Sequence, residues 1–368
     1  MLLFGIVWLT KIYNLTHVVE SFGLRPKLRW TLAEAKFSTF GRALPLILEF
    51  KSSSILLEVL VKWQPKNCQK LQKKIMPTTI YLETPKNFNF EQTLFGHGWS
   101  QLAPFEVDRE NLILSRVFSA AEVPISTQIS ESGEKIEIEI AEDKLDRKAK
   151  NKILRDVRHV LRLGDDLQGF YQSTALEKRL AWIAANNAGR LLRSPTVYED
   201  LVKTICTTNC SWALTKKMTA NLTEKLGEAA KDGRRAFPTA EKMAGVSAEF
   251  YKDEIRAGYR SGYFAELAEK VAGGVINPEN WLDSDLPTKE LKKQMKQIKG
   301  VGDYAAENLL KLVGRYDGLA LDSYLRAQFY ARHNGGEICE DKQIENFYQP
   351  FGDWRGLTIW CDMSESKS

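Results

Sequence analysis

Cysteine and histidine are scarce in this sequence of 368 residues, and the few present are scattered. The chain has five cysteines, no Cys-x-x-Cys pair, and four histidines that lie far apart. An odd number of dispersed cysteines in a long chain indicates a reducing compartment rather than a disulfide scaffold. Zinc and iron–sulfur sites need ligand spacings that this sequence lacks. We therefore expect neither a metal nor a cofactor.

Long apolar runs are also missing. The apolar stretch 1–10 ends at Lys11, well short of the ~20 residues that span a bilayer, and no basic segment precedes it as in a signal peptide. A second apolar cluster, 43–63, is interrupted by charged residues and serines. We therefore expect an intracellular protein that does not associate with membranes.

Acidic residues are few in the first fifth of the chain. Residues 1–75 hold 12 Lys and Arg against four Glu and no Asp, so the formal charge of +5 arises entirely from this segment. Because 65–74 is polar and basic and Met76 could itself begin a complete domain, we interpret 1–75 as a basic N-terminal extension, either a disordered arm or an artefact of the assigned start. Strong non-specific attraction to an acidic partner is expected from this segment.

Three short runs after Met76 have the composition of β-strands: 112–118, 124–129 and 135–140. The last alternates strictly, so its isoleucines should share one face of a sheet. After about residue 143, apolar residues recur at helical spacing instead. The sequence therefore predicts a mainly α fold, with a small α+β domain rich in β-structure over 76–145 and a helical body over 146–368.

The most informative stretch is a helical hairpin predicted over 288–313. Apolar residues at helical spacing define two helices, and Gly300-Val301-Gly302 separates them. The glycines allow a sharp turn, Val301 can pack between the helices, and the N–H groups that begin the second helix form an anion site. Five lysines between residues 286 and 302 favour a DNA phosphate, although the pattern alone is also typical of an ordinary αα-hairpin. The residues expected to contact DNA here are Lys299, Gly300, Val301, Gly302 and Asp303.

Asp322 follows Gly302 by 20 residues and, taken alone, would be only the N-cap of another helix. The hairpin and the aspartate together, Ile298-Lys-Gly-Val-Gly-Asp-Tyr-Ala-Ala306 and then Asp322, resemble the helix-hairpin-helix (HhH-GPD) DNA glycosylase superfamily. Further segments are similar to the 8-oxoguanine DNA glycosylases, and the second of them also to 3-methyladenine DNA glycosylase II: 189–211, 237–244 and 348–360. The likeness extends from about Thr78 to Trp360.

This resemblance implies a helical HhH-GPD glycosylase fold and a base-excision repair enzyme. Such an enzyme binds double-stranded DNA as a monomer, flips a damaged purine out of the helix and hydrolyses its N-glycosidic bond. Asp322 matches the essential carboxylate, which would stabilise the cation-like sugar and orient the attacking water. The resemblance also places the protein with the DNA, in the cytoplasm or nucleoid of a prokaryote or the nucleus of a eukaryote, and leaves open whether the purine is alkylated or oxidised.

Three further positions are assigned through the same resemblance. Tyr304 stands where bifunctional members carry the lysine that forms an imine with the sugar, and because a phenol cannot form one, a monofunctional enzyme is implied. Tyr304 either stacks on the flipped base or is simply packed. Asn209, with Thr208 beside it, matches the side chain that fills the gap left by the base, unless the segment only terminates a helix. Lys299 and Lys311 are interpreted as phosphate-facing or solvated.

Two alternatives to this function stay open. A chain that keeps the hairpin but does not excise bases would be a non-catalytic HhH DNA-binding protein. A lysine elsewhere in the chain could still give a bifunctional glycosylase with AP lyase activity. This chain also departs from the family at Tyr324, where a histidine often follows the aspartate by two residues.

Overall fold

The structure is a computed structural model that describes residues 78–120, 123–142 and 145–364. All of them belong to the second of two compact units, Ile75–Ser368. The basic extension predicted over 1–75 lies outside the described residues. Within the described ranges, no helix is both long and apolar enough to cross a membrane.

An antiparallel sheet of five strands forms the first layer of the described chain. The strands are β1 (Thr78–Glu83), β2 (Glu106–Asp108), β3 (Ile113–Phe118), β4 (Ile125–Ser132) and β5 (Lys135–Ile140). Their order across the sheet is β1-β5-β4-β3-β2. Ile136, Ile138 and Ile140 of β5 are all buried, which confirms the predicted alternation. The three predicted strands are confirmed apart from their ends, whereas β1 and β2 were not predicted.

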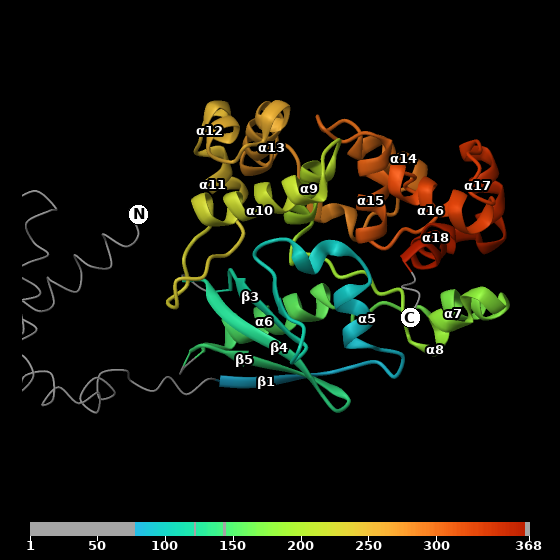
Figure 1. Ribbon diagram of the computed structural model, residues 1–368. Helices are drawn as coiled ribbons and strands as arrows, with labels where there is room; N and C mark the ends of the chain where they lie inside the picture. The colour runs from blue at the N-terminus through green and yellow to red at the C-terminus, as the bar shows by residue number, and fades with distance from the viewer. Residues whose placement is uncertain (1–77, 121–122, 143–144, 365–368) are drawn as a thin grey trace, which may run out of the picture. The chain divides into compact units, whose positions relative to one another are not determined.

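One helix packs against this sheet, as Figure 1 shows. α6 (Arg147–Val160) begins at Asp146, whose side chain accepts a hydrogen bond from the Ala149 N–H. Its apolar face shares a hydrophobic cluster with the isoleucines of β4 and β5, and the short helix α5 (Phe90–Phe95) adds to it. The boundary predicted after residue 145 therefore separates α6 from the sheet on which it packs.

The rest of the chain is helical, as the sequence predicts. The helices are α7 (Gln168–Ala175), α8 (Ala181–Ala185), α9 (Val197–Thr207), α10 (Trp212–Leu226), α11 (Ala240–Ala244), α12 (Ala248–Asp253), α13 (Ser261–Ala272), α14 (Thr288–Met295), α15 (Asp303–Leu312), α16 (Ser323–His333), α17 (Asp341–Tyr348) and α18 (Arg355–Ser364). A mainly α fold with a small sheet is thus confirmed.

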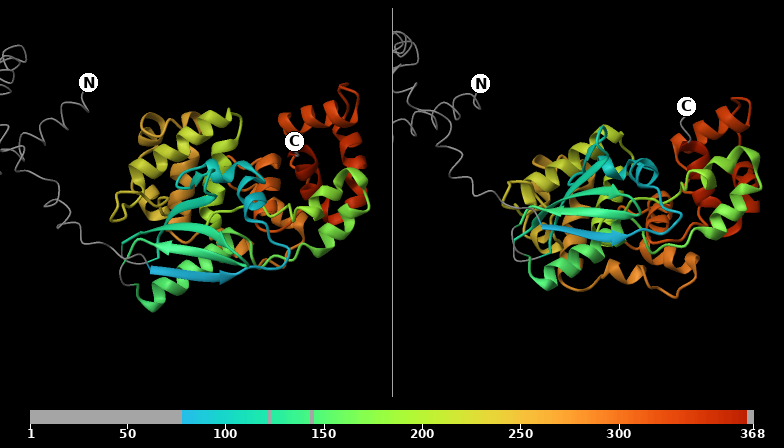
Figure 2. Two further views of the ribbon diagram at one scale, coloured as in Figure 1. Left: turned by 60° about the horizontal axis from the view of Figure 1, so that its bottom comes forward. Right: turned by 90° about the horizontal axis from the view of Figure 1, so that it is seen from below.

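Two hydrophobic clusters organise these helices. The larger cluster joins α9 through α15, and the hairpin helices α14 and α15 pack within it. In the other, α7 and α8 pack with α16, α17 and α18, although more than a hundred residues separate them in the sequence. Figures 1 and 2 show the green α7 and α8 beside the red C-terminal helices. The loop between α15 and α16, which contains Asp322, connects the two clusters.

A buried ion triad joins the sheet to α9. Arg116 of β3 donates through both terminal nitrogens to the carboxylate of Glu199, at 3.1 and 2.5 Å, and Lys203 Nζ lies 2.7 Å from Glu199 Oε1. All three side chains are at most 4% exposed. Burial alone would raise the pKa of Glu199, but the two cations more than offset it and hold the pKa below 4.5. Glu199 is therefore ionised in the folded protein at neutral pH, whereas burial lowers the pKa of Lys203.

Candidate active site

The helical hairpin has the turn that the sequence predicts. Between α14 and α15, Gly300 has φ +89° and Val301 is buried between the helices. A Cβ added to Gly300 would lie 2.8 Å from Tyr263 Cδ2, so both the backbone conformation and the packing require glycine there. Gly302 is exposed, and a Cβ added to it would meet nothing within 4 Å. The space beside Gly302, at the N-terminus of α15, is therefore open.

The lysines beside the turn are paired with acidic side chains. Asp303 accepts ion pairs from Lys292 (3.0 Å) and Lys296 (2.8 Å), and Lys299 pairs with Glu266 (2.6 Å). Hydrogen bonds from Lys296 and Lys292 lower the pKa of Asp303, so its negative charge persists but is compensated at the N-terminus of α15. Exposed pairs such as that of Lys299 are weak, and a DNA phosphate can take the place of the carboxylate.

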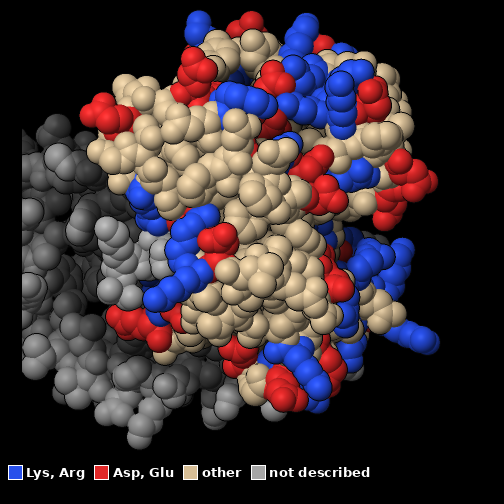
Figure 3. Space-filling view, turned by 90° about the vertical axis from the view of Figure 1, so that its right-hand side faces the viewer, with Lys and Arg blue, Asp and Glu red and all other residues tan. Residues whose placement is uncertain are grey.

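Charges of both signs are interspersed on the face shown in Figure 3. Lysines and arginines there lie next to acidic side chains, and uncharged residues fill much of the middle of the view. After residue 75, acidic residues slightly outnumber basic ones, 43 against 40. Attraction of this part of the chain to DNA would therefore depend on local groups at the hairpin rather than on overall charge.

The two glycines of the turn give a matched pair of variants. We expect Gly302→Ala to fold normally, because φ is −87° and the added methyl meets no protein atom, but to bind duplex DNA about 10-fold more weakly, a loss of about 1.4 kcal/mol. Gly300→Ala should lower the midpoint of thermal unfolding instead, because it adds backbone strain and a clash. Fluorescence anisotropy and thermal melts measure the two effects. Unchanged DNA affinity in Gly302→Ala would contradict a DNA-binding turn.

Asp322 is the N-cap of α16. Its Oδ1 accepts a hydrogen bond from the Leu325 N–H at 2.8 Å, at a helix end where a negative charge is favourable. The side chain is half-buried, and within the described part of the chain its Oδ2 accepts no hydrogen bond. One carboxylate oxygen is thus held in place while the other is free to face a substrate.

Tyr304 lies in the first turn of α15, and its phenol is neutral at physiological pH. Burial raises the pKa of the Tyr304 phenol, and the carboxylate of Asp322 raises it further. A hydrogen bond with the side chain of Thr207 acts in the opposite direction and links Tyr304 to the end of α9. Tyr304 is thus within electrostatic range of Asp322 and lies near the end of α9, which precedes the loop with Thr208 and Asn209.

The loop between α9 and α10 exposes Asn209. This residue has φ +45°, a conformation that asparagine tolerates better than most residues. Buried Arg260 donates to the carbonyl oxygens of Ile205 and Thr208 and so fixes the end of α9. Tyr259 is 55% exposed, and its hydroxyl lies 3.5 Å from Asn209 Nδ2. The sequence analysis missed Tyr259 because a single tyrosine outside a periodic pattern gives no signal of exposure.

Lys311 does not lie where the sequence predicts. It is only 2% exposed, and its Nζ donates a hydrogen bond to the Leu319 carbonyl at 2.9 Å. The interpretation of Lys311 as phosphate-facing or solvated is therefore wrong, because the loop before α16 and the ring of Trp360, 5.8 Å from Nζ, cover this side of α15. The side chain of Lys299, by contrast, is 64% exposed.

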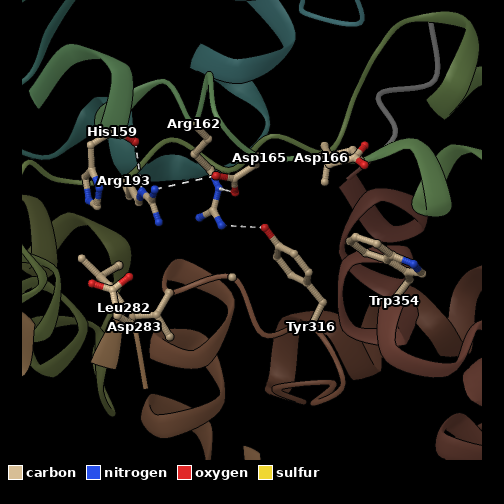
Figure 4. A pocket seen from close by; sticks show the side chains of 12 residues that line it. His159, Arg162, Asp165, Asp166, Arg193, Leu282, Asp283, Tyr316 and Trp354 are labelled. Carbon is tan, nitrogen blue, oxygen red and sulfur yellow. Dashed lines mark hydrogen bonds and ion pairs between the residues drawn. The ribbon is translucent and has the colours of Figure 1, made fainter. Parts of the chain in front are cut away.

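A cavity of about 420 Å³ lies at the C-terminal end of α15, away from the hairpin turn (Figure 4). Arg162 and Arg193, which line it, both donate to the Leu312 carbonyl, and Arg162 also donates to the Tyr316 hydroxyl. Burial, followed by the charges of Arg193 and Arg162, lowers the pKa of His159 in its wall to about 3, so this ring is neutral. Neither Asp322 nor Tyr304 lines this cavity, whose arginines satisfy the carbonyl end of α15.

Metal-ligating side chains do not gather in the described residues. No group of three or more His, Cys, Asp or Glu there is placed to hold an ion. The four described cysteines are free thiols, and burial raises the pKa of Cys206 to about 12.

Comparison with solved structures identifies the fold, whereas no protein-family model and no curated protein matches the chain. MBOgg1 in complex with a low-affinity DNA ligand is 20% identical, with 78% of this chain and 94% of that chain covered and a TM-score of 0.63. The fold is that of the helix-hairpin-helix DNA glycosylases.

Two further glycosylase structures agree. The apo-form of the 8-oxoguanine glycosylase/lyase of Clostridium acetobutylicum is 18% identical, with 79% of this chain and 98% of that chain covered and a TM-score of 0.62. The 3-methyladenine DNA glycosylase of Archaeoglobus fulgidus is 18% identical, with 77% and 96% covered and a TM-score of 0.63. The glycosylase fold predicted from the hairpin and Asp322 is thus confirmed over most of the chain.

Proposed function

We propose that this protein is a base-excision repair glycosylase that hydrolyses the N-glycosidic bond of a damaged purine in double-stranded DNA. The observation that carries the proposal is Asp322 at the N-terminus of α16, with Oδ1 held by the Leu325 N–H, in a glycosylase fold whose turn Gly300-Val301-Gly302 begins the helix of Tyr304. A single short segment thus combines an anion site for the DNA backbone, an aromatic ring and a carboxylate with one free oxygen. The protein would act as a monomer, without a cofactor, in the compartment that holds the DNA.

The chemistry follows from the charge of the transition state. The bond between the base and the sugar breaks with its electron pair leaving on the base, so the sugar becomes cation-like and water adds at its anomeric carbon. The free oxygen of Asp322 can stabilise that positive charge and accept a proton from the water. The ring of Tyr304, at the same site, offers a flat face to the flipped base.

The loop at the end of α9 supports base flipping. A base that leaves the duplex leaves a gap, and the exposed side chain of Asn209 is placed to enter it, next to Thr208. Arg260 holds the backbone at the start of this loop through its hydrogen bond to the Ile205 carbonyl. Tyr259 extends the exposed surface with a second aromatic ring. A rigid loop loses less conformational freedom on entering DNA than a flexible one.

Excision from a panel of lesions tests the proposal. Duplex oligonucleotides with alkylated purines, 8-oxoguanine, hypoxanthine or uracil are incubated with the full chain, and alkali then cleaves the strand wherever a base is lost. We expect cleavage at one or more of the purine lesions and none in undamaged duplex. A protein that binds these duplexes but releases no base would be a non-catalytic DNA-binding protein instead.

The absence of a lysine at position 304 predicts a monofunctional enzyme. Tyr304 cannot form an imine, and the amine of Lys311 is buried and donates to the Leu319 carbonyl. We therefore expect strand cleavage only after alkali and no covalent adduct when borohydride is added during the reaction, with a glycosylase/lyase as positive control. A trapped adduct would show that another lysine acts as a nucleophile.

A further inference from the structure

The backbone just before Asp322 is held in an unfavourable conformation. Ala320 has φ +54°, in the left-handed region that residues with a Cβ seldom adopt. It is buried and lies two residues before the carboxylate. Such a conformation persists only where neighbouring groups hold it.

Two side chains of α15 hold the peptide that joins Leu319 to Ala320. Lys311 Nζ donates to the Leu319 carbonyl at 2.9 Å, and Glu307 Oε2 accepts from the Ala320 N–H. Lys311 and Glu307 are one helical turn apart, so they lie on the same side of α15. Both bonds are charge-assisted, which makes them stronger than bonds between neutral groups.

Negative groups around Lys311 stabilise the positive charge of its buried amine. Burial lowers its pKa to about 8, and the carboxylates of Glu307 and then Asp322 act in the opposite direction. Burial, then the charge of Arg162 and to a lesser extent that of Lys311, lowers the pKa of His97 to about 3, so this imidazole is neutral. The amine of Lys311 therefore interacts with groups inside the protein rather than with solvent.

We infer that Lys311 and Glu307 are positioning residues, which hold the Leu319–Ala320 peptide in the left-handed conformation that presents Asp322 to the sugar. The inference rests on the proposed function. Small displacements of a reacting group slow a reaction strongly, so a clamp at this peptide controls the chemical step.

The clamp is linked to the DNA-binding turn. Lys292 of α14 contacts both Asp303, in the first turn of α15, and Glu307, at 3.0 and 2.5 Å. One lysine therefore bridges the residue beside the proposed phosphate site and a residue that fixes the backbone before Asp322.

Lys311→Met tests the clamp on the chemical step. Methionine has a similar length but no donor, so we expect the single-turnover rate of excision to fall about 10- to 100-fold. Affinity for a duplex with a stable abasic-site analogue should stay within about twofold, because no DNA-contacting group changes. Glu307→Ala should act in the same way, and Glu307→Gln, which keeps an oxygen for the Ala320 N–H, should retain more activity.

Two further variants separate positioning from general damage. Ala320→Gly removes the cost of the left-handed conformation, so in the Lys311→Met background it should recover part of the lost rate. Lys203→Met makes the same change at another fully buried lysine, and it should lower stability without slowing excision by the folded protein. A wild-type rate in Lys311→Met, or equal losses of rate and affinity without recovery by Ala320→Gly, would overturn the inference.

Hydrogen exchange gives a readout that does not need excision. Amides of residues 316–324 should exchange faster in Lys311→Met than in the wild type, and unchanged exchange there would contradict the clamp. If the wild type excises no base while this exchange difference is found, the proposed function fails and the clamp stands. A borohydride adduct that forms with the wild type and is lost in Lys311→Met would make Lys311 a nucleophile and overturn its positioning role.

Discussion

Asp322→Asn should lower base excision by about 10³-fold or more while duplex DNA is still bound. Asparagine keeps an oxygen that can accept from the Leu325 N–H and is a good N-cap, so α16 should remain intact. What is lost is the negative charge beside the cation-like sugar. Single-turnover excision on the preferred lesion, together with anisotropy on the same duplex, measures both quantities.

A matched control exists elsewhere in the chain. Asp146 caps α6 in the same way, through a hydrogen bond from the Ala149 N–H at 2.7 Å, but it lies on the helix that packs against the sheet. Asp146→Asn makes the same chemical change at the same kind of position and should leave excision unchanged. Equal excision by Asp322→Asn and the wild type would refute the catalytic assignment, and an equal loss in both variants would point to folding.

Among the substitutions described, Glu199→Gln should lower the free energy of unfolding the most. The amide keeps the shape of the side chain but removes the charge that compensates Arg116 and Lys203, and both cations stay buried. Leaving buried charges without a partner costs about 3–5 kcal/mol of unfolding free energy. Urea unfolding measures the difference, and the exposed pair of Lys225 with Glu254 supplies the control, since Glu254→Gln should leave the midpoint unchanged.

The same residue predicts a pH dependence. Because its folded pKa lies below the unfolded value of 4.5, the Glu199 carboxylate contributes stability that is present above pH 4.5 and is lost as the pH falls through the folded pKa. Glu199→Gln lacks this titration, so its unfolding free energy should change less with acidification than that of the wild type. Equal slopes for the two proteins below pH 4.5 would contradict a charged triad.

The parts of the fold that were predictable are those with a strong local pattern. The strand 135–140 alternates over its whole length, and the turn Gly300-Val301-Gly302 sits between two periodic segments. β1 was missed because only two of its side chains, Ile80 and Leu82, are apolar and buried, which is too short a run to signal a strand. Local pattern decides local structure wherever one face is clearly apolar.

The residues of the candidate site were inferred from the family resemblance, whereas the groups that support them were not foreseen. Asp322 caps α16 in the structure, and burial, followed by the charge of Asp322, raises the pKa of the Tyr304 phenol. Lys311 was interpreted as phosphate-facing or solvated, since lysine is seldom fully buried, yet the side of α15 that carries it is covered. Lys311 donates a hydrogen bond to the Leu319 carbonyl because the loop between α15 and α16 folds back over α15. The conformation of that loop cannot be predicted from the spacing of residues in the sequence.

The two ends of α15 lie in different electrostatic surroundings. The helix dipole is compensated by cations at one end and not at the other. At its C-terminus, the guanidinium groups of Arg162 and Arg193 lie against the Leu312 carbonyl and cancel the negative pole of the helix dipole. The positive pole, beyond Gly302, faces outward. We expect an attraction for phosphate there to come from the peptide backbone, which does not titrate, while Lys292 and Lys296 compensate the carboxylate of Asp303 beside it.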